Sequence, residues 1–241
     1  MEKSESPRST AEIVDEYYRC FYERVHGGGG PGLIESLMHK SLERKSRVPH
    51  RMLEIGVGNF EHLPYLKSEP SLYVAIDLRS PSDEMLRINR FEKAKAEDVK
   101  GLTTGRYFVQ VSIEEFCSLD VGLFDRIVAS CVLLHLDEPD VVMTLLLRIL
   151  EEESSEMRLL LPTEPSWIIN LWRMLVSRRR AQALGFNHFD LVNAADHKNY
   201  SRRVAVFAGH VFADENWRIR GVPISSPFDI ATPYSILEVD R

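Results

Sequence analysis

The stretch LEIGVGNFEHLPYL, residues 53–66, is an apolar run interrupted by two glycines and followed by a helix-like segment. Glycines at such positions permit a tight turn and let a ligand approach the backbone, and a following helix offers free N–H groups. We therefore predict a strand over residues 51–55, a nucleotide-binding turn at Gly56 and Gly58, and a helix over 60–66.

The turn departs from the pattern that binds dinucleotides. That pattern, Gly-x-Gly-x-x-Gly, uses a third glycine for close packing of the helix on the strand, and Glu61 stands in its place. A bulky anion at this position lies closest to where a pyrophosphate would bind. The residues thus disfavour NAD and FAD, although a nicotinamide-dependent oxidoreductase remains an alternative.

Two carboxylates indicate a different ligand. Asp77 ends the next predicted strand, 71–77, nineteen residues after Gly58, where a carboxylate accepts hydrogen bonds from both hydroxyls of a ribose. Glu54 adds a second negative charge directly before the glycines. A sulfonium and an α-amino group suit this charge better than a diphosphate does, so we expect the cofactor to be S-adenosylmethionine (SAM).

Strands and helices alternate from residue 51 to the end of the sequence. This alternation is typical of an α/β fold with a doubly wound, mainly parallel sheet, here of seven strands. The further predicted strands are 106–111, 124–130, 157–161, 217–222 and 235–239, and the further predicted helices are 83–97, 139–150, 168–184 and 200–212.

The region before this alternation has its own pattern. Residues 10–25 place apolar and aromatic side chains at helical spacing, a glycine-rich run occupies 27–32, and 33–45 reads as a second amphipathic helix. We interpret 1–48 as an N-terminal helical lid with a glycine hinge. In a single domain of 1–241, this lid would precede a SAM-binding half, 50–165, and acceptor-side helices and final strands, 166–241.

Four motifs in this order resemble those of the class I SAM-dependent methyltransferases. They are LEIGVGN, YVAIDL, FVQVSIEEF and FDRIVASCVLLHL, which begin at residues 53, 73, 108 and 124. The resemblance covers roughly residues 50–165 and implies a Rossmann-like fold that transfers a methyl group from SAM. More loosely, EHLPYL, LLLPTEPSW and ADHKNY resemble a bacterial subgroup that acts on small molecules, often surface sugars or secondary metabolites.

The resemblance also implies which residues contact the cofactor. Asp77 would bind the ribose, and Ser112 stands where an aspartate usually bonds the adenine amino group, with Ile113 packing beside it. Independently of the resemblance, one of Tyr17, Tyr18 and Tyr22 in an aromatic helix would lie over the sulfonium, because cations favour aromatic faces, and we take Tyr18 as the candidate; ordinary packing of that helix is the alternative. The expected cofactor residues are Tyr18, Glu54, Gly56, Val57, Gly58, Asn59, Asp77, Leu78, Ser112, Ile113, Ser130 and Cys131.

Two histidines are candidates for the catalytic base. Alignment of the acceptor with the methyl group supplies much of the rate, but transfer to a hydroxyl usually needs a base, for which histidine has a suitable pKa. His135 follows the fourth predicted strand, and His197 lies in the DHKNY segment. Each histidine also has a purely structural interpretation.

The net charge and its distribution along the sequence indicate what kind of partner the protein binds. The net charge of −6 disfavours a general nucleic-acid binder, but residues 166–220 contain nine Lys or Arg against four Asp or Glu. This favours an anionic small-molecule acceptor, such as a phosphorylated or nucleotide-linked sugar or a carboxylated natural product. A merely solvated basic face is the alternative.

Other features limit the remaining partners. We find no apolar run long enough to span a membrane, no signal-peptide core at the polar N-terminus, and three cysteines without a metal-binding spacing. We expect a cytoplasmic protein without a metal, nucleic-acid or membrane partner, and leave its oligomeric state open. A SAM-binding partner or regulatory protein that has lost catalysis is the alternative function.

Overall fold

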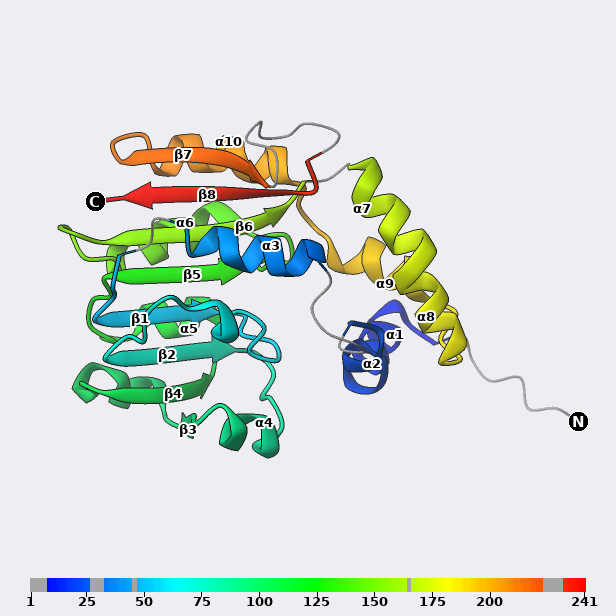
Figure 1. The fold of residues 1–241 in the computed structure, drawn as a ribbon, viewed down its shortest axis with the longest axis horizontal. Coiled ribbons are helices and arrows are strands. Elements are labelled where there is room, and N and C mark those ends of the chain that lie inside the picture. The colour runs from blue at the N-terminus through cyan, green and yellow to red at the C-terminus, as the bar shows by residue number, and fades with distance from the viewer. Residues whose placement is uncertain (1–7, 27–32, 45–46, 164–165, 223–231) are drawn as a thin grey trace, which may run out of the picture.

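The structure, a computed structural model, describes residues 8–26, 33–44, 47–163, 166–222 and 232–241. The glycine run predicted as a hinge lies outside the described residues. In the described residues, a mixed sheet is flanked by helices on both faces, and a further group of helices lies beyond the carboxyl ends of the parallel strands (Figure 1).

The sheet has the strand order β3-β4-β2-β1-β5-β6-β8-β7 in the described part of the chain. All neighbouring strands pair in parallel except β8, which is antiparallel to both β6 and β7. The strands are β1 Arg51–Ile55, β2 Leu72–Asp77, β3 Glu92–Lys93, β4 Gly105–Gln110, β5 Arg126–Ser130, β6 Glu156–Pro162, β7 Asn216–Val222 and β8 Tyr234–Asp240.

The predicted doubly wound, mainly parallel sheet is confirmed, but it has eight strands rather than seven. The additional strand, β3, pairs with β4 inside the segment 83–97 that was predicted to be one helix. That helix ends at Ile88 because Arg90 adopts a φ of +61° and Phe91 turns into the apolar layer beneath it. A bulky residue in this left-handed region cannot continue a helix.

Helices cover the two faces of the sheet. On one face, α5 Ile113–Ser118, α6 Pro139–Ile149 and α10 Ser201–Val211 pack on the apolar residues of the central strands. On the other face lie α3 Leu33–Leu42 and α4 Asp83–Ile88. The central strands are buried on both faces, as parallel strands in α/β proteins usually are.

The remaining helices form a group that we call the cap. It consists of α1 Thr10–Glu16, α2 Tyr22–His26, α7 Trp167–Trp172, α8 Arg178–Ala183 and α9 Phe189–Asp196. π-helical turns join α1 to α2 and α7 to α8, and α9 occupies a segment for which no helix was predicted. The cap lies on the side where the parallel strands end (Figure 1).

The N-terminal helices divide between the cap and the sheet. Tyr17 packs its ring against Phe186 and Phe189, which holds α1 against α9. The helix α3 instead packs on β6 and β7, although the sequence grouped it with the lid. Among the described residues, none of the helices has the length and apolar character needed to span a bilayer.

Candidate active site

The turn after β1 has the geometry that the two glycines predict. Gly56 and Gly58 have φ angles of +67° and +52°, and a Cβ on Gly56 would lie 2.3 Å from Cγ2 of Val132. Phe60 also adopts a positive φ, and Pro64 falls within a single 3₁₀ turn, Leu63–Tyr65. The predicted helix over 60–66 is therefore wrong, because a left-handed residue and a proline interrupt the segment.

Asp77 lies at the end of β2, opposite this turn. Its carboxylate accepts hydrogen bonds from the backbone N–H of Gly58, at 3.2 Å, and of Arg79, at 2.9 Å. The side chain is therefore held at the carboxyl edge of the sheet, next to the place where the strand order reverses between β1 and β5. Ligands of open α/β sheets bind at such a place.

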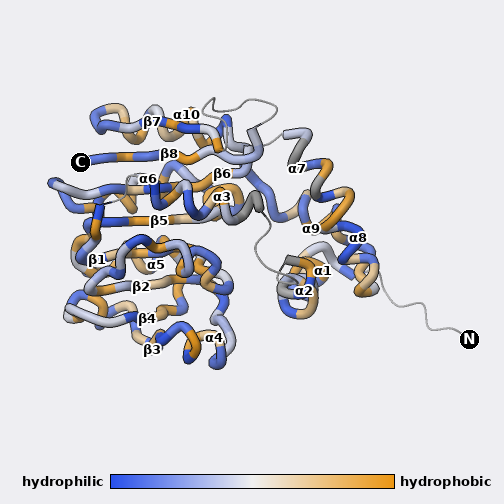
Figure 2. The backbone as a smooth tube through the Cα atoms, viewed as in Figure 1, coloured by the Kyte–Doolittle hydropathy of each residue, from blue (hydrophilic) through white to orange (hydrophobic). Residues whose placement is uncertain are grey.

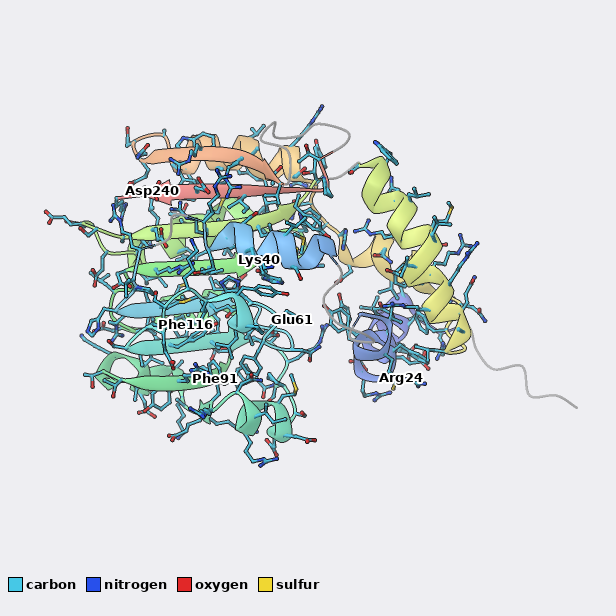
Figure 3. The ribbon with its side chains drawn as sticks, in the orientation of Figure 1. Arg24, Lys40, Glu61, Phe91, Phe116 and Asp240 are labelled. Atoms are coloured by element: carbon cyan, nitrogen blue, oxygen red, sulfur yellow. The ribbon has the colours of Figure 1, made fainter. Side chains whose placement is uncertain are left out.

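Glu54 and Glu61 lie near the same turn in different surroundings. Glu54 is buried and accepts a hydrogen bond from the Tyr73 hydroxyl. Burial is the main cause that raises the pKa of Glu54 well above the usual value, and the nearby charge of Glu61 is the second cause. Glu61 accepts the N–H of Asn59 at 3.0 Å and lies at the cap-facing edge of the sheet (Figure 3). Glu54 thus contributes less negative charge than its position in the sequence suggests.

The residues expected around the adenine and the end of β2 also have structural roles. The Ser112 hydroxyl caps α5 by accepting the N–H of Glu115 at 3.1 Å, and Ile113 is buried in the apolar core. Val57 is buried as well, whereas Leu78 is exposed. Their contacts with a cofactor stay predictions.

The end of β5 is also shaped for a ligand. Cys131 adopts a φ of +61°, a conformation that is uncommon for non-glycine residues and is often found at ligand sites as well as at turns. The preceding Ser130 has a buried Oγ without a hydrogen-bond partner among the described residues. A buried hydroxyl without a partner is costly, so a polar group of a ligand would stabilise it.

Beyond β5, the structure brings both candidate histidines together. Nδ1 of His135 lies 3.1 Å from Oδ2 of Asp196 and 3.1 Å from its carbonyl oxygen, and the rings of His135 and His197 meet edge to face at 5.1 Å. Asp196 ends α9 and His197 follows it. We call His135, Asp196 and His197 the junction cluster, because it joins the sheet to the cap.

Tyr18 extends this cluster to the N-terminal helices. Its hydroxyl donates a hydrogen bond to Oδ2 of Asp196, and the guanidinium of Arg79 lies 3.7 Å from the centre of its ring. Tyr22 lies near the glycine turn. Burial is the main cause that raises the pKa of Tyr22, and the charges of Glu61, Cys131 and Asp77 raise it further. The cap therefore approaches both the turn and the junction cluster.

The pKa shifts of His135 and Asp196 favour an ion pair between the imidazolium and the carboxylate. Burial lowers the pKa of His135, but the hydrogen bonds and charge of Asp196 outweigh it, and the net shift is upward. Burial raises the pKa of Asp196, but His135, followed by Tyr18, lowers it below its usual value. The imidazole is thus held at Nδ1 by a carboxylate, which makes it a stronger base.

The same three residues form a donor set that could hold a metal ion, with ligand atoms within 4.8 Å of one another. However, the carboxylate of Asp196 already accepts a hydrogen bond from the Tyr18 hydroxyl. Nδ1 of His197 lies 3.2 Å from the guanidinium of Arg173, and the guanidinium of Arg79 stacks on the ring of Tyr18. Two guanidinium groups close by disfavour a bound cation. The cluster suits proton transfer better than metal binding.

Sequence reasoning missed three of these residues. Asp196 lies in the quoted ADHKNY segment, but nothing in the sequence connects it with His135, 61 positions earlier. Arg79 and Arg173 have no recognisable motif. Only the tertiary structure brings the loops after β2 and β5 next to the cap.

Comparisons with known proteins identify the domain and the fold. A family model described as a methyltransferase domain matches residues 53–155. No curated protein matches the sequence significantly.

The fold is similar to those of several solved methyltransferases. The plantazolicin methyltransferase BpumL in complex with S-adenosylhomocysteine (SAH) has 13% identity and a TM-score of 0.58, with 95% of this chain and 90% of that chain covered. A possible histamine N-methyltransferase from Thermotoga maritima has 14% identity and a TM-score of 0.56, with 95% and 96% covered. Magnesium protoporphyrin IX methyltransferase (ChlM) from Synechocystis, with bound SAM, has 13% identity and a TM-score of 0.51, with 99% and 100% covered.

Proposed function

We propose that this class I SAM-dependent methyltransferase, whose methyltransferase domain spans residues 53–155, methylates an oxygen or nitrogen of a small acceptor bound between the sheet and the cap. We further propose that His135 removes the proton of the acceptor. The observation that carries this proposal is the hydrogen bond between Nδ1 of His135 and the carboxylate of Asp196. The alternative of a nicotinamide-dependent oxidoreductase is not retained, because the family match and the missing third glycine both disfavour it.

The residues at the sheet edge fit the cofactor. Asp77 would accept hydrogen bonds from the ribose hydroxyls, and the close approach of Val132 to Gly56 means that the turn needs a residue without a side chain. The buried hydroxyl of Ser130 would gain a partner. When bound, the cofactor supplies a methyl group that its sulfonium already activates.

The junction cluster would handle the proton. Because Asp196 holds Nδ1–H of His135, Nε2 is left as the acceptor of a proton. Asp196 also stabilises the imidazolium that forms. A general base of this kind contributes about 10²- to 10⁴-fold to the rate.

The charges near the cluster support an anionic acceptor. Arg173 contacts His197, whereas Arg178 is exposed and pairs with Asp190. An arginine fork matches a carboxylate or phosphate, so we propose that Arg173 binds the acid group of a phosphorylated or nucleotide-linked sugar or a carboxylated natural product. An acceptor of the kind named for the similar structures, plantazolicin or magnesium protoporphyrin IX, is the alternative.

The test is release of SAH with a panel of acceptors. The panel pairs phosphorylated sugars, nucleotide sugars and carboxylated phenols with neutral counterparts. We expect an anionic member to be methylated faster than its neutral counterpart, and His135→Gln to lower kcat by about 10²- to 10⁴-fold. His50→Gln, at an exposed histidine, is the matched control and should leave kcat unchanged.

The pH profile separates a base from a structural histidine. Since Asp196 raises the pKa of His135, Asp196→Asn should shift the rising limb of kcat/KM to lower pH and reduce its plateau. Full activity in His135→Gln would contradict the proposed base. SAH binding without methylation of any acceptor would favour the alternative, a SAM-binding partner or regulatory protein.

A further inference from the structure

The cap carries an apolar helical face that the methyltransferase site does not use. It lies on the segment 167–183, which comprises α7, the π-helical turn Arg173–Ser177 and α8. Four large apolar side chains at helical spacing are 41–53% exposed on this segment: Trp167, Leu171, Met174 and Leu175. Its other face is buried against the cap through Ser177 and Ala181.

This face lies at the periphery of the molecule. Figure 1 shows α7 and α8 on the side of the cap that is remote from the sheet, and Figure 2 shows hydrophobic and hydrophilic stretches alternating along both helices. An exposed group of large apolar side chains on one helix marks an interaction surface more often than an isolated exposed leucine does.

The charge of the segment indicates the chemistry of the partner. Residues 167–183 contain four arginines and no aspartate or glutamate, in a chain whose net charge is −6. Arg173 contacts His197 and Arg180 donates to the carbonyl of Val25, so Arg178 and Arg179 remain for the partner, with Arg178 in an exposed ion pair with Asp190. Arg178 and Arg179 are exposed directly after the apolar side chains. A helix with tryptophan and leucine on one face and arginines beside it is typical of helices that lie in the interface of an anionic membrane.

We propose that the segment 167–183 docks on an anionic lipid surface, with Trp167, Leu171, Met174 and Leu175 entering the headgroup layer and the exposed Arg178 and Arg179 contacting lipid phosphates. This proposal departs from the expectation, drawn from the sequence, of no membrane partner, which rested on the lack of a spanning segment; an interfacial helix lies in the plane of the membrane and needs none. The proposal does not depend on the proposed acceptor or on the base.

A second copy of the chain fits this face less well. A helix of 17 residues is about 25 Å long, and a stripe about 10 Å wide would bury roughly 250 Å² per copy. A stable dimer usually buries about 800 Å² per partner. A lipid surface needs no such area from a matching protein face.

The experiment is co-sedimentation of the full chain with vesicles of phosphatidylcholine alone or mixed with phosphatidylglycerol. We expect the chain to sediment with the mixed vesicles, less so at high salt, and not with phosphatidylcholine alone. The double variant Leu171→Glu with Met174→Glu should bind at least about tenfold more weakly. Its melting temperature and SAH affinity should stay as in the wild type.

Val206→Glu provides the matched control. Val206 is 73% exposed on α10, near Arg202 and Arg203, but it is not part of the stripe on residues 167–183. Equal weakening by Val206→Glu, equal binding to both vesicle types, or no sedimentation at all would overturn the proposal. So would a wild-type dimer in light scattering that the double variant converts to a monomer, because the face would then join two copies.

Discussion

The sheet and the cap of this protein are stabilised by different interactions. The sheet has strands buried on both faces and, under α3, a buried ionic network in which Arg126 lies between Glu43 and Glu156. The cap depends on an aromatic cluster around Tyr17 and is joined to the loop after β5 through Asp196 and the backbone of Leu134.

The difference has a consequence for function. The groups that fit the cofactor lie at the edge of the rigid sheet, whereas the proposed base is completed by a residue of the cap. We therefore expect the cap to open without unfolding of the sheet, which would let an acceptor enter while the cofactor site persists.

The largest stability effect should come from breaking the ionic network of the sheet. Arg126→Met would leave Glu43 and Glu156 buried without their shared cation, at a cost of about 3–5 kcal/mol in the free energy of unfolding. Denaturant titration measures this. The control Lys93→Met, which removes an exposed ion pair with Asp83, should have a much smaller effect because solvent screens the pair, and equal losses would contradict the account.

A smaller and local effect is expected in the cap. Tyr17→Ala removes a buried ring that contacts Phe186 and Phe189 and should destabilise the cap by about 3 kcal/mol. Hydrogen exchange followed by mass spectrometry should show faster exchange in α1 and α9 and unchanged exchange in β1. Tyr17→Phe, which keeps the ring, is the control, and equal acceleration in β1 would show that cap and sheet unfold together.

A third effect, at most as large as that in the cap and confined to acidic pH, should be a pH dependence of the sheet. Burial, followed by the proximity of His62, lowers the pKa of His39 to about 4. The unfolded chain binds this proton near pH 6.5, so the contribution of His39 to stability is complete above that pH and falls by up to about 3 kcal/mol as the pH drops towards 4. His39→Gln should flatten the denaturation profile between pH 6.5 and 4.

Glu54, whose pKa burial raises, acts within this interval with the opposite sign in both proteins, so the effect of His39 is the difference between the two profiles. Glu43 and His135 act outside the interval. Burial raises the pKa of Glu43, but hydrogen bonds from His62 and Arg126 outweigh it and lower the pKa to about 2, so its contribution is lost only below about pH 4.5. The raised pKa of His135 gives stability at low pH that is lost as the pH rises through the raised value. An unchanged profile in His39→Gln would contradict the assignment to His39.

The fold could be predicted largely from local patterns. The turn at Gly56 and Gly58 and the position of Asp77 follow from short-range geometry, and the alternation of strands and helices defines the sheet. The strand β3 was missed because two residues carry no periodicity. The helix α9 was missed because its segment lies between two stronger helical patterns.

The junction cluster could be predicted only in part. His135 and His197 were found because histidine is the usual base at neutral pH, but their partners depend on tertiary contacts. Tyr18 was expected over the sulfonium. The structure places its hydroxyl on Asp196 and its ring under Arg79, and its contact with a sulfonium stays a prediction.

The most direct test of the central claim, a cofactor site on the sheet and a base at the junction with the cap, is calorimetric titration of SAH into three proteins. The account predicts that Asp77→Ala binds SAH at least about 100-fold more weakly than the wild type, because hydrogen bonds to a charged group are lost. It also predicts that His135→Gln binds SAH within about twofold of the wild type. Wild-type affinity in Asp77→Ala, or an equal loss in His135→Gln, would contradict it.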